Sequence, residues 1–492
     1  MNEGSQIPVP QDFRSLSRRR MLQVGCAALP GLLTPRAWGL EPGDDVLQQW
    51  LKRTAVAADP ASSEDFSPAA LEGVLSSIGD ARVVLLGEPS HGSGAAFRAK
   101  VRLVRLLHER LGFDVLAWES GFIDLERTEA GLRSGMDPVQ AAQQGILKIW
   151  SASAECRPLF VYAQESHRGK KPLTMAGFDM QLTAAGTLEY FARELRAFVA
   201  KFPARLGAAP VAEQFLESFG RLNRYTDALA AKLDELGRSG VNGAARGAAI
   251  GAWNKSEGDS IRPVAPDLEA LQKAAAALEP MLGEGSPAER AGFMVQAVRG
   301  LTAYGANLLE DQGKHTAEQE AIYAVGRENR RDQANAENLR WMIDKEYAGR
   351  KIMVWAHNAH VMNAWYGPHF DSISLAPLQG GMKTTGTWLT GWYGREVYKV
   401  GFTAYQGQEA MVGSAAAPVP AAPVGSVEER LHRLGFAEAF LPLRPGKRGE
   451  GCPVSPVEMR IPKFKEESVE DPAQAFDALY FIDTMTPATS IG

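Results

Sequence analysis

Cysteine is scarce in this chain of 492 residues, which contains only three. Cys26 lies near the N-terminus, and the other two are Cys156 and Cys452. Two cysteines define no disulfide framework, although they could form one bond in an oxidising compartment; otherwise both are structural thiols. Neither has a cysteine or histidine neighbour at metal-binding spacing, which argues against a cysteine-based metal centre.

The chain also lacks a long apolar run, internal repeats and heptads. A membrane-spanning helix needs about 20 consecutive apolar residues, so none is predicted. The formal net charge of −5 argues against nucleic acid or an anionic membrane as the main partner. With 45% hydrophobic and 23% charged residues, the composition is that of a globular protein with one elaborated domain or two subdomains.

The N-terminus has the pattern of a twin-arginine export signal. Residues 17–22 read Ser-Arg-Arg-Arg-Met-Leu, an apolar run follows from Val24 to Leu33, and residues 37–39 offer a cleavage site. We predict that residues 1–39 are a Tat-type signal peptide and that the mature protein is periplasmic or secreted. No stable membrane partner is expected apart from the export machinery. The alternatives are a membrane anchor and a basic cytosolic tail.

Strands and helices alternate in the first part of the chain. Apolar runs predict strands at residues 83–86, 114–118 and 173–177, and a helix at residues 95–111 joins the first two. Such a βαβ unit favours a parallel pair of strands with a right-handed crossover. We therefore assign residues 40–185 to the first part of an α/β core.

The middle of the chain, residues 186–347, has mostly helical periodicity and is predicted to be a large helical insertion that forms a cap or second lobe. The predicted helices span residues 188–202, 211–236, 267–282, 288–309 and 316–347. Residues 237–258 are rich in Gly, Ala, Ser and Asn, which predicts a loop.

The sheet resumes in residues 348–492, the second part of the core. Its predicted strands span residues 351–355, 387–392, 397–402 and 478–482. The Ala/Pro run at residues 415–424 predicts a mobile loop. The predicted class is α/β, with a mixed, mainly parallel central sheet flanked by helices.

Polar motifs follow two predicted strands that lie far apart in the sequence. Glu88 and His91 come after the first strand, and His357 and His360 come after the strand at residues 351–355. A further carboxylate, Glu119, follows a third strand. Because α/β proteins place their chemistry at the carboxyl ends of strands, we expect these side chains to meet in one cleft.

These residue types suit hydrolysis by an activated water. Histidine titrates near neutral pH, so it can take a proton from water and return it, while a carboxylate holds its tautomer. A second histidine can donate to a developing oxyanion. A single histidine is more often structural, but three of the eight in the chain lie in these two motifs, which favours a site.

Other chemistries fit less well. Ser90 lacks the Gly-x-Ser-x-Gly elbow of a serine hydrolase, and no Gly-Lys-Ser/Thr phosphate loop is present. The two pairs at i,i+3 spacing are good ligand types, so a divalent-metal-dependent hydrolase or peptidase is an alternative. A non-catalytic periplasmic haem- or metal-binding protein is a third interpretation, although the motifs carry more acid/base groups than binding requires.

The ordered series of motifs resembles the erythromycin esterase family over about residues 80–485. The positions that carry the resemblance are Gly87-Glu88-x-x-His91-Gly92, Lys100, Glu119, Gly177-x-Asp179, Arg331-Asp332 with Ala336 and Asn338, Trp355-x-His357-Asn358-x-His360 and Phe476-Asp477-Ala478-Leu479. The resemblance implies a small-molecule ester or lactone substrate, such as a macrolide lactone in antibiotic resistance, and no metal or other cofactor.

The resemblance also implies roles for individual residues. His91 would be the general base, oriented with its water by Glu88 and Glu119. The residues assigned to catalysis are His91, Glu88, Glu119, His357 and His360, and those assigned to substrate binding are Lys100, Arg331 and Asp179. We predict an exported hydrolase that cleaves an ester or lactone bond.

Overall fold

The computed structural model describes residues 42–59, 67–201, 207–241, 243–262, 264–283, 290–310, 317–363, 369–370, 373–374, 382–444, 457–460, 468–470 and 472–491. The chain divides into Met1–Asp45 and a compact unit, Val46–Gly492, to which the features below belong. The predicted signal peptide and Cys452 lie outside the described residues. Within those residues, no helix combines the length and apolarity needed to cross a membrane.

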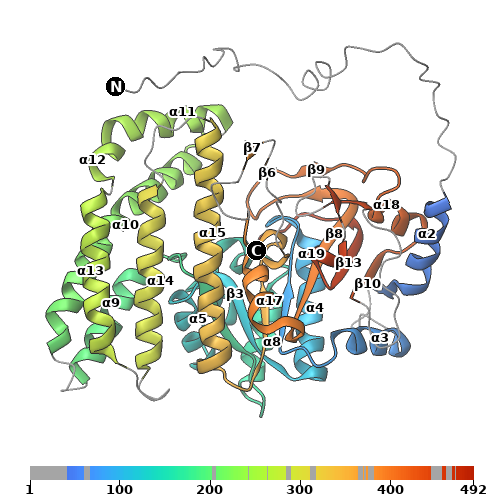
Figure 1. Ribbon diagram of the computed structural model, residues 1–492, viewed down its shortest axis with the longest axis horizontal. Coiled ribbons are helices and arrows are strands. Elements are labelled where there is room, and N and C mark those ends of the chain that lie inside the picture. Colours follow the sequence, from blue (N-terminus) through green and yellow to red (C-terminus); the bar gives the residue numbers. More distant parts are fainter. Residues whose placement is uncertain are drawn as a thin grey trace, which may run out of the picture. The chain divides into compact units, whose positions relative to one another are not determined.

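A nine-stranded sheet forms the centre of the unit (Figure 1). Its order is β1-β10-β13-β8-β2-β5-β3-β4, and β9 pairs with β8. The strands are β1 (Val56–Ala58), β2 (Val83–Leu86), β3 (Phe113–Gly121), β4 (Thr174–Asp179), β5 (Lys351–Trp355), β8 (Val397–Glu409), β9 (Ala417–Val419), β10 (Glu438–Pro442) and β13 (Ala478–Met485). Two short hairpins lie apart from it, β6 (His369–Phe370) with β7 (Ile373–Ser374) and β11 (Val457–Met459) with β12 (Ser468–Glu470).

The six strands from β13 to β4 are parallel, whereas β10 pairs antiparallel with both β1 and β13. The prediction of a mixed, mainly parallel α/β sheet is confirmed. The first two strands are parallel, as expected, but they do not pair with each other, because β5 lies between β2 and β3 and is parallel to both. A strand from the second half of the chain thus completes the sheet of the first half.

The alternation of side chains along the strands divides the core between the two faces of the sheet. Val83 and Leu85 of β2 belong to one apolar cluster, and Val84 and Leu86 belong to the other. The second cluster includes α4 (Gly94–Leu111), which ends at Gly112 with φ +72°, in the left-handed region that favours glycine. Both faces of the sheet are therefore covered, as a parallel sheet requires.

The helical insertion covers the opposite face from α4, because its apolar side chains share the cluster that contains Val83 and Leu85. In Figure 1 these helices, green to yellow, stand together, and α15 is the one beside the strands. They are α9 (Thr187–Lys201), α10 (Ala209–Arg238), α11 (Gly243–Trp253), α12 (Asp259–Ile261), α13 (Ala265–Leu282), α14 (Ala291–Glu310) and α15 (Ala317–Trp341), with π-helical turns at Asn254–Gly258 and Met342–Glu346.

Three sequence predictions are wrong in detail. Residues 237–258 are not a loop but contain α11, since alanine-rich segments favour helix. Residues 387–392 are not a strand but lie in α17 (Thr385–Tyr393), whose first turn is capped by the Thr384 side chain accepting from Thr387 N. The Ala/Pro run includes β9, which pairs antiparallel with β8 as an edge strand that tolerates proline.

The remaining helices connect these elements. Those described are α2 (Pro42–Thr54), α3 (Pro68–Ile78), α5 (Asp124–Arg133), α6 (Pro138–Gln143), α7 (Lys148–Ser151), α8 (Arg157–Ser166), α16 (Asn358–Val361), α18 (Val427–Arg433) and α19 (Pro472–Ala475). A short 3-10 turn, Gly394–Glu396, leads from α17 into β8. Of these, α7 and α16 contribute directly to the site.

Candidate active site

The turn after β2 begins at Gly87, where a side chain has no room. A Cβ there would lie 2.1 Å from Oδ1 of Asn358, in the first turn of α16. That amide accepts from Phe402 N at 3.0 Å and donates to Phe402 O at 2.7 Å. The glycine therefore allows Asn358 to link the carboxyl ends of β2 and β5 to the middle of β8, and Glu88 and His357 follow side by side from the two neighbouring strands.

Glu88 is fully buried and receives three donors. Nζ of Lys100 lies 2.8 Å from Oε2, and Nδ1 of His91 and Nε1 of Trp150 lie 2.9 Å and 3.0 Å from Oε1. Lys100 is itself fully buried, donates to Ala356 O and lies 4.1 Å from the centroid of the Trp355 ring. Burial lowers the pKa of Lys100 despite the opposing effect of Glu88. Lys100 thus contacts the carboxylate that holds the histidine, not the open side of the site.

His91 is the more accessible half of the pair. Its side chain is 33% exposed, and no described residue forms a hydrogen bond with its Nε2. Its ring meets the Trp150 and His357 rings edge-on, at centroid distances of 5.4 Å and 5.2 Å. A histidine with one nitrogen fixed by a buried carboxylate and the other facing outward can exchange a proton with a bound molecule.

Glu119, at the end of β3, connects the two motifs. Its Oε2 accepts from His357 N at 2.9 Å, and its Oε1 lies 2.9 Å from Nη2 of Arg331 and 3.3 Å from Nε2 of His360. Burial alone would raise its pKa, but His360, Arg331 and His91 hold the pKa well below its usual value. Glu119 is therefore an anion that accepts hydrogen bonds and not a proton donor.

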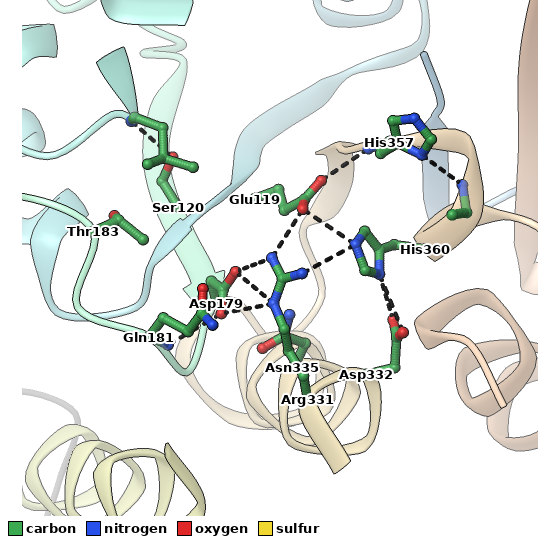
Figure 2. A network of polar contacts seen from close by, with 12 residues as sticks. Glu119, Ser120, Asp179, Gln181, Thr183, Arg331, Asp332, Asn335, His357 and His360 are labelled. Atoms are coloured by element: carbon green, nitrogen blue, oxygen red, sulfur yellow. Dashed lines mark hydrogen bonds and ion pairs between the residues drawn. The ribbon is translucent and has the colours of Figure 1, made fainter. Parts of the chain in front are cut away.

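Arg331 projects from α15 into the centre of this network (Figure 2). Its guanidinium lies 2.5 Å from Oδ2 of the buried Asp179, at the end of β4, and its Nη1 lies 3.2 Å from Nε2 of His360. Burial would lower the pKa of Arg331, but Asp179 and Glu119 raise it well above its usual value. The arginine stays charged and joins the helical insertion to the sheet.

His360 forms a second histidine–carboxylate pair. Its Nδ1 lies 2.9 Å from Oδ1 of Asp332, which is buried and also accepts from Thr385 N at 2.9 Å and Oγ1 at 2.6 Å. Burial and Arg331 lower the pKa of His360, but Asp332 and Glu119 outweigh them and raise it well above its ordinary value. Figure 2 shows this ring between the two carboxylates. His360 is thus an imidazolium at neutral pH.

His357 is buried beside His91. Its Nδ1 accepts from Ala359 N at 3.0 Å, so a neutral ring carries its proton on Nε2. All eight residues selected from the sequence therefore lie in one connected network. Its members are Glu88, His91, Lys100, Glu119, Asp179, Arg331, His357 and His360.

Three further members of the network were not selected from the sequence. Asp332 adjoins Arg331 in the motif series, and its acidic side chain was the available signal. Asn358 lies within the His-Asn-Ala-His motif but has no titratable group. Trp150 comes from α7, outside any motif, and only the fold brings its indole to Glu88.

The donor set does not favour a metal ion. Among the described residues, Glu328, Asp332 and His360 bring three potential ligand atoms within 4.8 Å of one another. The Arg331 guanidinium lies beside the same imidazole, and two Thr385 donors already occupy Asp332. At the other pair, the Lys100 ammonium contacts Glu88. These positive groups would repel a divalent cation.

The comparisons with known proteins agree with this architecture. Residues 108–485 match the family model for erythromycin esterase, and because this is more than half of the chain, the protein belongs to the erythromycin esterase family. In Bacillus subtilis (strain 168), the "Putative hydrolase YbfO" is 34% identical over 132 residues, which are 27% of this chain. The matched part is only 28% of that protein's length.

Solved structures show the same fold at low sequence identity. A Bacillus cereus protein has a TM-score of 0.61 and 16% identity over 91% of this chain and 99% of its own. A succinoglycan biosynthesis protein has a TM-score of 0.60 and 16% identity over 92% and 99% of the two chains. A mutant erythromycin esterase in its open conformation has a TM-score of 0.51 and 14% identity over 88% and 98%.

Proposed function

We propose that this protein hydrolyses a carboxylic ester or lactone by direct attack of water, with His91 as the general base. The observation that carries the proposal is the His91–Glu88 pair. Glu88 is buried and fixed on Nδ1 of the imidazole, while Nε2 has no hydrogen-bond partner among the described residues and the side chain is 33% exposed. This is the geometry that a general base for water requires.

In the first step Nε2 of His91 takes a proton from water as the water oxygen attacks the substrate carbonyl carbon. Nδ1–H donates to Glu88, which keeps the proton of the neutral ring on Nδ1 and stabilises the imidazolium. Lys100 and Trp150 donate to the same carboxylate. Glu88 can therefore orient the ring while remaining an anion.

The tetrahedral intermediate carries its negative charge on the former carbonyl oxygen. His357 is the neighbouring imidazole, and with its proton on Nε2 it is our choice for the donor to this oxyanion. Arg331 and His360, which both contact Glu119, add fixed positive charge on the same side of the site as His357. When the carbon–oxygen bond breaks, the leaving alkoxide takes the proton from His91, which restores the neutral base.

The test is a screen of the protein without residues 1–39 against macrolides, simple lactones and aryl esters. His91→Gln should lower kcat by about 10²–10⁴-fold on any substrate that is turned over, because it removes the base. His432→Gln is the matched control, since His432 also pairs with a carboxylate, Asp483, at 2.6 Å, but lies outside the network. Full activity of a folded His91→Gln variant would sink the proposal.

The same screen separates the alternatives. A divalent-metal hydrolase or peptidase would lose activity on chelation and regain it with one added metal, whereas water activation by His91 predicts no change. A haem- or metal-binding protein would show ligand-dependent absorbance without turnover. The proximity of Lys100 and Arg331 to the two histidine–carboxylate pairs is our reason for preferring the metal-independent reaction.

We also propose export through the twin-arginine pathway and no partner beyond the small-molecule substrate and the export machinery. The support is the sequence pattern at residues 17–39. Replacement of both Arg18 and Arg19 by Lys should retain the protein in the cytoplasm, as measured by fractionation of the bacterial host. Unchanged export of that variant would contradict the proposal.

A further inference from the structure

The segment after β13, Thr486–Ile491, runs between two parts of the site that have no strand or helix in common. On one side is the loop of Gly92 and Ser93, directly after His91, with Gly94 at the start of α4. On the other is the turn Ala152–Glu155 between α7 and α8, which follows Trp150. We call this segment the strap.

Backbone hydrogen bonds attach the strap to the loop that carries His91. Ala488 N donates to Gly92 O at 3.0 Å, and Pro487 forms an antiparallel bridge with Ser93. A Cβ at Gly94 would lie 2.3 Å from Pro487 O, so the two backbones are in close contact. Only glycine permits this approach without displacing the strap.

A second set of contacts attaches the strap to the turn after α7. Ala154 N donates to Thr489 O at 2.8 Å, and Ile491 N donates to Ala152 O at 2.9 Å. Thr489 also donates to Glu155 through its backbone N at 3.0 Å and its Oγ1 at 2.8 Å. Glu155 is only 8% exposed, and Ser153 Oγ donates to it at 2.7 Å.

Both attachments act on the same pair of residues. The loop holds His91 directly, and α7 places the Trp150 indole 3.0 Å from Oε1 of Glu88 and edge-on to the His91 ring. The strap therefore connects the support of the imidazole to the support of its carboxylate. Displacement of the strap should change the angle at which His91 meets Glu88, although the described hydrogen bonds of these two side chains go to each other, Lys100 and Trp150 and not to the strap.

We propose that the strap is a positioning element for the His91–Glu88 pair and that Glu155, through Thr489, is its positioning residue. The catalytic consequence rests on the proposed function of His91, whereas the effect on the geometry of His91 does not. A misplacement on the order of 1 Å can lower a rate by about 100-fold, so the strap should affect kcat much more than KM.

The experiment compares Glu155→Gln and Thr489→Val with Thr484→Val. Thr484 is a matched control because it is also exposed and also donates to a carboxylate, Asp483, at 3.0 Å, but lies before the strap. The steady-state probe is 4-nitrophenyl butyrate, or a substrate from the screen if that ester is not turned over. The structural probe is the imidazole signal of His91 in protein labelled with ¹⁵N-histidine, assigned by its loss in His91→Gln.

Both strap variants should shift the His91 imidazole signal and lower kcat by about 10- to 100-fold with little change in KM. Thr484→Val should do neither, and Thr489→Ser, which keeps the hydroxyl, should restore both readouts. If circular dichroism shows that Thr489→Val is unfolded, the His91 signal and kcat of Glu155→Gln, compared with those of Thr489→Ser, test the proposal instead.

The outcomes separate the two proposals. An unmoved His91 signal in folded strap variants overturns the positioning role, whatever happens to kcat. A shifted signal in a protein whose hydrolysis does not depend on His91 leaves the positioning role intact and overturns the proposed function. A shifted signal with unchanged kcat, in an enzyme that His91→Gln inactivates, also overturns the strap proposal.

Discussion

The two histidine–carboxylate pairs of the site share one contact and differ in their surroundings. In both, Nδ1 lies 2.9 Å from a buried carboxylate oxygen, of Glu88 for His91 and of Asp332 for His360. The His91 side chain is 33% exposed, whereas that of His360 is 10% exposed and its Nε2 faces Glu119 and Arg331. We call His91–Glu88 the open pair and His360–Asp332 the closed pair.

The difference shows that a paired carboxylate does not by itself define a general base. In the closed pair, two carboxylates keep the ring protonated, so it has no lone pair to offer. In the open pair, the second nitrogen remains available for a bound molecule. Burial and the charges around the second nitrogen therefore decide which histidine exchanges protons and which one supplies fixed charge.

Removing Arg331, which lies beside the closed pair, should have the largest effect, and this effect is on stability. Arg331→Met leaves the buried Asp179 without its ion-pair partner and removes one of the two cations beside Glu119, which should lower the free energy of unfolding by about 3–5 kcal/mol. Urea unfolding at neutral pH measures this. The control is Arg330→Met, one residue earlier on the same helix, where a guanidinium hydrogen bond to Asn307 Oδ1 is lost. Equal losses of unfolding free energy in the two variants would show that the ion pairs of Arg331 contribute no more than the hydrogen bond of Arg330.

The carboxylate of the open pair should have the next largest effect, which we expect on the rate. Glu88→Gln replaces the acceptor that fixes the His91 tautomer, so kcat should fall by about 100-fold or more, which is roughly 2.7 kcal/mol in activation free energy. Steady-state kinetics on the best substrate measure it. Asp483→Asn removes the equivalent partner of His432 and should leave kcat unchanged. A fall in both variants would contradict this distinction.

The charge of the closed pair should be visible in the pH dependence of stability. The folded pKa of His360 lies well above its unfolded value of 6.5, so this contribution is fully present below pH 6.5 and is lost as the pH rises through the folded pKa. The slope for one proton is at most about 1.4 kcal/mol per pH unit. Asp332→Asn should reduce that slope and lower the pKa of His360, measured by urea unfolding and imidazole NMR. An unchanged titration would show that Asp332 does not hold the proton.

The smallest effect is expected from Thr385→Val. It removes one side-chain donor to Asp332 but leaves the carboxylate and the backbone donor of residue 385, so the free energy of unfolding should fall by about 1 kcal/mol. His360 should remain protonated at neutral pH in the imidazole NMR spectrum. If Thr385→Val changed the titration of His360 more than Asp332→Asn does, the Thr385 hydroxyl would matter more for the protonation of His360 than the Asp332 carboxylate.

The sequence was a good guide where a residue's role follows from its neighbours in the chain. The four residues of β2 are all buried, and a short apolar run followed by Gly-Glu predicts both the strand and the position of Glu88. Because the carboxyl ends of parallel strands meet at one edge of the sheet, His91, His357 and Glu119 are then expected to lie close together. Five residues of the network could be selected in this way before their contacts were known, whereas Lys100, Arg331 and Asp179 were assigned from the family resemblance.

The sequence was a poor guide where tertiary contacts decide. Residues 385–393 are rich in threonine and tryptophan, which favour strand, but the Thr384 cap and the contact with α15 make them helical. Trp150 contacts Glu88 from 62 residues away, and no local pattern predicts that hydrogen bond. In the sequence, Asp332 is one of several charged residues of a helix, and only the fold shows that it contacts His360.

The insertion of β5 between β2 and β3 has a consequence for the order of folding. During synthesis β2, β3, β4 and the whole helical lobe leave the ribosome before Lys351, while the strand edges that will receive β5 are still unpaired. Pairing of Leu86 and of Trp118 with Trp355 closes loops of more than 230 residues, which makes this step slow relative to local helix formation. Because Glu119 meets His357 only across these pairings, the active site assembles late, and a nascent chain that ends before β5 has no site to use.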